Sequence, residues 1–206
     1  MDTYSSMSIP AAYIVSSVGG RWHRLRLLIK EGPVSEIQIR RLHAVGEAEI
    51  AGLSDVLIDC VTGGASVSFM WPMTQEKART FWTKVAAGVS RGERILLVAE
   101  DATGSIVGTV QVVIDLPENQ PHRGDVSKML VHRRARCKGV GAALLVAAEA
   151  AALEAGKTVL VLDTASDSAE RLYARQGWQL CGQIPKYALM PDGAFCATTV
   201  FYKILS

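Results

Sequence analysis

The sequence predicts an α/β protein, and three observations carry that prediction. Residues 94–100 and 105–116 are apolar, β-rich runs on either side of an Asp-Ala-Thr-Gly turn, which is typical of a β-hairpin. Residues 158–163 form a short apolar run after an alanine-rich helical stretch at 142–155, as in a buried strand that a helical crossover reaches. Helical and strand patterns also alternate along the rest of the chain, which favours one layered domain.

The elements before the hairpin follow from periodicity. Residues 36–42 alternate between apolar and polar side chains and predict the first strand. Apolar residues at helical spacing predict helices over 46–60 and 74–89, with Thr74 as the N-cap of the second helix. A flexible polar loop, residues 62–69, separates these helices.

The elements after the hairpin form a strand–turn–helix unit followed by a further helix and two strands. A strand at 125–132 leads through a basic turn into the alanine-rich helix. A short helix is expected over 167–176, where Asp167 and Glu170 have the spacing of a capping box. Strands at 178–189 and 194–205 are joined by a Met-Pro-Asp-Gly turn.

Length and composition limit the class of protein. A chain of 206 residues fits one domain, and 49% hydrophobic with 20% charged residues is the composition of a soluble globular protein. The net charge of +2 is too small to indicate a nucleic-acid partner. No stretch reaches the roughly 18 apolar residues that a membrane span needs, so no membrane partner is expected.

The cysteines and the first residues bear on location and on domain limits. The four cysteines lie far apart without a Cys-x-x-Cys pair, so no metal site is expected. The same spacing favours a reducing, cytoplasmic location. Gly32-Pro33 is a plausible boundary. Residues 1–34 are then an N-terminal extension, and three interpretations of it stay open: a targeting segment, a poorly ordered extension, or upstream sequence counted into the chain. The main domain is expected over residues 35–206.

The basic turn carries a candidate phosphate site. Arg136-x-x-Gly139-x-Gly141-Ala142 places small residues at a helix N-terminus, where backbone N–H groups and the helix dipole suit a phosphate or pyrophosphate. Further cations crowd the same turn and strengthen its field: Arg133, Arg134 and Lys138. The spacing is neither that of a Walker loop nor that of a Rossmann turn.

This turn resembles the acyl-CoA pyrophosphate loop of the GNAT N-acetyltransferase superfamily. The stretch from Ala169 through Tyr173 to Trp178 is similar to a second signature of that family, and the order of elements agrees over roughly residues 36–205. The resemblance implies a twisted mixed sheet of six to seven strands with helices on both faces. It also implies acetyl-CoA as co-substrate, with its pantetheine in a gap between two splayed strands, here 126–131 and 159–163.

The resemblance assigns the acetyl-CoA contacts to two stretches. On the strand, a backbone N–H of Met129 or Leu130 would meet the thioester oxygen, and Val131 follows them. Lys128 on the same strand either contacts the substrate or belongs to the polar side of the strand. In the loop, backbone amides and basic side chains would hold the pyrophosphate: Arg136, Cys137, Lys138, Gly139, Val140, Gly141 and Ala142.

Tyr173 and Asp163 are the candidate catalytic residues. A phenol with a pKa near ~10 is matched to a thiol near ~8.5, so Tyr173 suits the role of proton donor to the leaving thiolate. Asp163 ends the apolar strand beside the gap, where its carboxylate would take the amine proton or anchor the ammonium group. The alternatives are that Tyr173 is a core aromatic residue and that Asp163 caps the following loop. Asp125 is a rival for the base, because the resemblance implies an acidic residue on its strand, and its own alternative is a solvated position at the strand's start.

Three segments resemble the tabtoxin resistance acetyltransferase group more closely, and that group acetylates a small amino-acid-like toxin. They are residues 63–70, residues 162–164 and residues 187–193. We therefore expect direct acetyl transfer, in a ternary complex, to a small-molecule amine such as a toxin or antibiotic. Ser66, Ser68 and Trp71 are expected to line the acceptor pocket. The alternatives are a protein or peptide N-acetyltransferase and a non-catalytic acyl-CoA-binding module, and a homodimer is left open.

Overall fold

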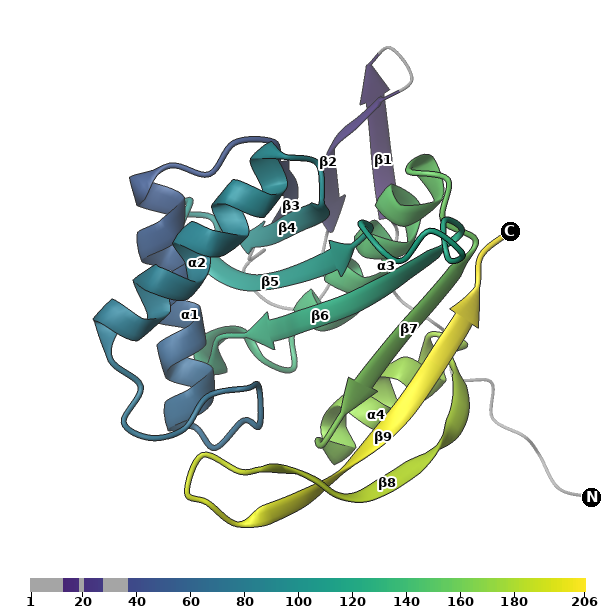
Figure 1. Ribbon diagram of the computed structural model, residues 1–206. Coiled ribbons are helices and arrows are strands. Elements are labelled where there is room, and N and C mark those ends of the chain that lie inside the picture. The colour runs from purple at the N-terminus through teal and green to yellow at the C-terminus, as the bar shows by residue number, and fades with distance from the viewer. Residues whose placement is uncertain (1–12, 19–20, 28–36) are drawn as a thin grey trace, which may run out of the picture.

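A computed structural model describes residues 13–18, 21–27 and 37–206, and the strands within them form one nine-stranded sheet (Figure 1). The strands lie side by side in the order β1-β2-β3-β4-β5-β6-β7-β9-β8. Every described pair is antiparallel except β6 with β7, which is parallel. The strands are β1 Tyr13–Val18, β2 Arg21–Leu27, β3 Ile37–Leu42, β4 Arg94–Glu100, β5 Ile106–Val113, β6 Arg123–Val131, β7 Val159–Thr164, β8 Gln179–Leu189 and β9 Phe195–Ile204.

Helices cover both faces of this sheet, as predicted (Figure 1). Helices α1 (Glu47–Thr62) and α2 (Gln75–Ser90) pack on one face, and α3 (Val140–Glu154) and α4 (Asp167–Arg175) pack on the other. The mixed α/β fold class is therefore confirmed. Within the described residues, no helix is long and apolar enough to cross a membrane.

The sheet has more strands than the six to seven that were expected. Strands β3 to β9 account for seven, and β1 and β2 add two more by antiparallel pairing beyond β3. Both added strands lie in the segment interpreted as an N-terminal extension. The other residues of the segment 1–34 lie outside the described residues, and the interpretation is not tested there.

The ends of the helices test the capping predictions. The Thr74 hydroxyl accepts a hydrogen bond from the Lys77 N–H at 3.2 Å, so the predicted N-cap of α2 is confirmed. The capping box predicted at Asp167 and Glu170 is wrong. Ser166 is the N-cap of α4, and the carboxylate of Glu170 accepts a hydrogen bond from the Thr199 hydroxyl of β9 instead. A tertiary contact has replaced a local one.

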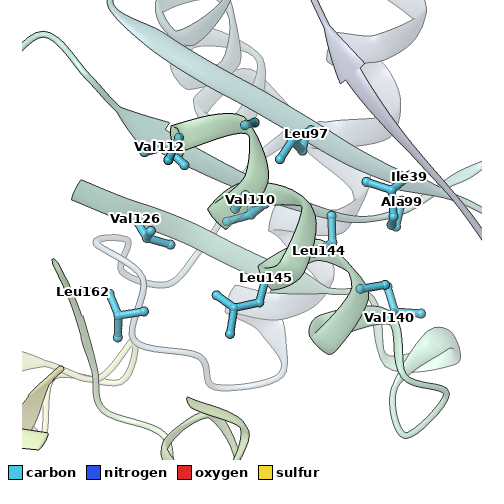
Figure 2. Close-up of a cluster of buried hydrophobic side chains, with 14 of the residues drawn as sticks. Ile39, Leu97, Ala99, Val110, Val112, Val126, Val140, Leu144, Leu145 and Leu162 are labelled. Carbon is cyan, nitrogen blue, oxygen red and sulfur yellow. The ribbon is translucent and has the colours of Figure 1, made fainter. Parts of the chain in front are cut away.

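The larger core lies between α3 and the sheet (Figure 2). Leu144 and Leu145 of α3 point to the sheet, where valines of β5 and β6 meet them. This burial explains why α3 is apolar over most of its length, since about half of its residues are buried in this core. The second core lies under α1 and α2, around the fully buried Trp82.

Replacing Leu144 with alanine is expected to lower the free energy of unfolding by about 2–5 kcal/mol, because a fully buried side chain leaves a cavity. Urea denaturation followed by circular dichroism measures the loss. Leu153→Ala is the matched control, because Leu153 lies on the same helix and is 44% exposed. Equal losses in the two variants would contradict the burial assigned to α3.

Candidate active site

The site begins where β6 and β7 part. The two strands pair at only three positions, from Arg123 with Val159 to Asp125 with Val161. Beyond them β6 continues to Val131 while the two strands diverge (Figure 1). Backbone groups on the facing edges of the diverging segments have no strand partner across the gap, and the predicted splay of these strands is present.

A β-bulge lies on β6 beside this gap. Strand β6 pairs through Leu130 with Thr109 and through Ser127 with Gln111. Lys128 and Met129 therefore lie opposite the single residue Val110. Lys128 has φ +50°, in the left-handed region. A bulge leaves one residue outside the ladder and redirects its side chain, so Lys128 departs from the regular alternation of β6.

The phosphate loop runs from β6 to α3 through a short 3₁₀ turn, Arg133–Ala135. Gly139 is the N-cap of α3 with φ +75°, a conformation that favours glycine. It carries no side chain to cap the helix, and the first helical bond runs from the Ala143 N–H to the Gly139 carbonyl. The N–H groups of residues 140–142 therefore have no partner within the helix, and such a group of donors at the positive end of a helix suits an anion.

A close approach fixes the start of α3 against α4. A Cβ added to Gly141 would lie 3.1 Å from Cδ2 of Leu172. A side chain at this position would require Leu172 to shift by a few tenths of an ångström. Packing therefore favours glycine at position 141, and the backbone conformation favours it at position 139.

The cations of the loop differ in their partners. Arg133 donates from its backbone N–H and from Nε to the Asp59 carboxylate, each at 2.8 Å. Arg136 folds back, so that its Nε donates to the Val131 carbonyl at 3.1 Å. Lys138 is exposed and makes no hydrogen bond or ion pair with a described residue. Arg136 therefore holds the loop against β6, and Lys138 is the cation best available to an anion.

Tyr173 lies on α4 at the edge of the larger core. It is 4% exposed, and its ring packs against Trp178 and Phe201 with centroid distances of 5.9 and 5.7 Å. Burial raises the pKa of Tyr173 to about 12, and the negative charge of Asp163 acts in the same direction. The phenol therefore stays protonated at neutral and moderately alkaline pH.

Asp163 lies near the end of β7 with an exposed side chain. The hydroxyl of the buried Thr198 on β9 donates to its Oδ2 at 2.7 Å. This bond orients the carboxylate, and Oδ1 has no hydrogen-bond partner among the described residues. Because the charge of Asp163 acts on both Tyr173 and Lys128, the structure brings these three side chains into one electrostatic environment.

The three predicted acceptor residues lie on the loop between α1 and α2 but face different ways. The Ser68 hydroxyl accepts a hydrogen bond from Lys128 Nζ at 3.1 Å. The Ser66 hydroxyl donates to the Leu189 carbonyl at 3.0 Å, and the Trp71 indole donates to the Val61 carbonyl at 2.9 Å. Ser68 therefore joins the site directly, whereas Ser66 and Trp71 fasten the loop that carries it.

Lys128 is a residue whose role the sequence alone left undecided. Its Nζ lies 5.7 Å from the centroid of the Phe81 ring on α2, in addition to its bond to Ser68. Burial lowers the pKa of this ammonium, while the Asp163 carboxylate acts in the opposite direction. No sequence pattern reveals a bulge at this position, because the bulge depends on how β5 and β6 pair.

A glycine-capped helix N-terminus suited to an anion follows β6, which diverges from its parallel neighbour β7. This arrangement is the one that the resemblance to acyl-CoA-dependent acetyltransferases implies. Residues 56–178, more than half of the chain, match the family described as the acetyltransferase (GNAT) family. The chain belongs to the GNAT family and is an acetyl-CoA-dependent N-acetyltransferase.

Solved structures with this fold include enzymes named for very different acceptors. The ribosomal-protein-alanine N-acetyltransferase of Brucella melitensis is 25% identical, with 81% of this chain and 99% of that chain covered and a TM-score of 0.67. The phosphinothricin acetyltransferase of Sinorhizobium meliloti, solved with acetyl-CoA, is 17% identical over 82% and 89% of the two chains, with a TM-score of 0.69. YncA of Salmonella typhimurium, also solved with acetyl-CoA, is 20% identical over 82% and 94%, with a TM-score of 0.67.

Proposed function

We propose that this enzyme transfers the acetyl group directly to the amine of a small molecule, an amino-acid-like toxin or antibiotic. The observation that carries the proposal is the Asp163 carboxylate, which Thr198 orients on β7 and whose charge acts on both Tyr173 and Lys128. Acetyl-CoA supplies the acetyl thioester. The resemblance to the tabtoxin resistance acetyltransferases supports the choice of acceptor class, and so does the likeness in fold to a phosphinothricin acetyltransferase.

The chain offers a group for each requirement of the transfer. The first turn of α3 and Lys138 hold the phosphates, and the bulge on β6 offers a backbone N–H at Met129 or Leu130 to the thioester oxygen. Asp163 receives the proton of the attacking amine, and Tyr173 gives a proton to the thiolate that leaves. The transfer needs no acyl-enzyme intermediate, because acid, base and anion sites suffice for direct attack.

A small acceptor is favoured by the loop between α1 and α2. Its backbone is tied to the turn of the β8–β9 hairpin, since the Trp71 N–H donates to the Pro191 carbonyl at 3.0 Å and Ser66 donates to Leu189. A loop fastened at two points to the hairpin is held in one position, as a wall shaped for one small acceptor would be. This supports a compact acceptor over a protein chain end.

Thiol release from acetyl-CoA over a panel of amines tests the proposal. The panel contains amino acids, amino-acid-like antibiotics, and peptides with free N-termini. Turnover of the small amines above the acceptor-free rate is the expected result. Turnover of peptides alone would instead support a protein N-acetyltransferase. Binding of acetyl-CoA without turnover of any amine would support a non-catalytic binding module. The homodimer stays a prediction, which analytical ultracentrifugation checks.

Replacing Lys138 with glutamine is expected to weaken CoA binding about 3- to 10-fold, because an exposed cation near a phosphate contributes a modest, screened attraction. Titration calorimetry with CoA measures the change, which should shrink as ionic strength rises. Lys84→Gln is the matched control, because it removes the same charge from an exposed position on α2. An equal change in both variants would show that Lys138 does not contact the phosphates.

A further inference from the structure

Lys128 has an unfavourable backbone conformation. Its φ of +50° is uncommon for a residue other than glycine, and such conformations persist where the surroundings impose them. Here the bulge opposite Val110 imposes it. A regular strand would have placed position 128 in the ladder, so the bulge serves to redirect this side chain.

The ammonium of Lys128 meets groups from three elements. Its Nζ donates to Ser68 on the loop after α1 and lies over the ring of Phe81 on α2. Ser68 has φ +76°, so the hydroxyl is also presented from a strained backbone. These contacts direct the cation to the side of the sheet that α1 and α2 cover.

The half-buried ammonium of Lys128 has few polar partners. Lys128 makes no ion pair within 4.0 Å with a described carboxylate, and Ser68 is its one hydrogen-bond acceptor among the described residues. An ammonium has three N–H donors, so two remain for another acceptor. A partly buried ammonium without an anionic partner is unfavourable unless a ligand supplies one.

We propose that Lys128 determines acceptor specificity by binding an anionic group, such as a carboxylate, on the amine that is acetylated. This rests on the proposed function. Asp163, on β7 across the gap, faces the amine of that acceptor. A molecule carrying both an amine and an acid group is thereby oriented by two opposite charges, and an amine without the acid group loses one of its two contacts.

The test compares amino acids with their primary carboxamides as acceptors, for the wild type, Lys128→Met and Lys128→Arg. In Lys128→Met, kcat/KM for the acids is expected to fall roughly 10- to 100-fold, mainly through KM, while the amides change by less than about 3-fold. Lys128→Arg should restore part of the preference. The amide and the acid differ in amine pKa. For each acceptor, the ratio of kcat/KM in the wild type to kcat/KM in the variant cancels that difference.

Lys84→Met is the control, because it removes an exposed lysine one turn from Phe81 and should change neither class of acceptor. Thermal denaturation of Lys128→Met and its CoA affinity show whether the fold and the cofactor site are intact. Equal losses on acids and amides, or no loss on either, would overturn the role of Lys128 and leave the proposed function standing. If the wild type acetylates no amine, the proposed function itself has failed.

Discussion

Replacing Tyr173 with phenylalanine is expected to lower kcat by roughly 10²- to 10³-fold, as for the loss of a general acid. The affinity for acetyl-CoA should stay the same, because the ring and its contacts with Trp178 and Phe201 are kept. The hydroxyl has no hydrogen-bond partner among the described residues, so its removal should also leave the free energy of unfolding almost unchanged. Steady-state kinetics and urea denaturation measure the two effects.

The pH dependence distinguishes a proton donor from a core aromatic residue. Burial disfavours the phenolate, so the pKa of Tyr173 is raised to about 12, and the protonated donor is lost only as pH rises through that value. The loss of rate in Tyr173→Phe should therefore be the same at pH 7 and pH 9. Tyr202→Phe is the matched control, because it removes a phenol hydroxyl that bonds to Gln179 on β8. If both variants keep full activity, Tyr173 is structural.

Local patterns were enough to predict most of the fold. The strands and helices from β3 to β9 fall within a few residues of the predicted ranges, because each has the periodicity of its class. The start of α3 was placed two residues late, since a glycine N-cap leaves no capping side chain to see in the sequence. The capping box at Asp167 failed for a related reason, because Thr199 of β9 competes for Glu170.

Candidate site residues could be proposed from the sequence where a motif is local and not where the candidate depends on strand pairing. The phosphate loop and Tyr173 belong to short signatures, and Asp163 ends a recognisable strand. Lys128 is redirected by a bulge that follows from the register of β5 and β6. Ser66 contacts Leu189 across 123 positions of sequence, so no local pattern predicts that it fastens the loop. Contacts between distant segments therefore decide which way the polar side chains of this loop point.

Replacing Asp163 with asparagine is expected to lower kcat by roughly 10²-fold at pH 7, because the variant removes the group that takes the proton of the amine. Asparagine has nearly the same shape, and its amide oxygen can still accept the hydrogen bond that Thr198 donates. The loss should therefore reflect the missing charge and not a rearranged β7. Steady-state kinetics at saturating acetyl-CoA, with an amine that the wild type acetylates, measures it.

The pH profile of Asp163→Asn should differ from that of Tyr173→Phe. As the pH rises toward the amine pKa of about 10, solution removes the proton that Asp163 would have taken, so the variant should recover toward the wild type. Asp115→Asn is the control, because this exposed residue follows β5 at the other end of β6 from the bulge. A rise in KM with kcat unchanged would mean that Asp163 anchors the ammonium group of the acceptor. In that case the acceptor binds as the ammonium ion, and its proton must leave after binding and before the attack.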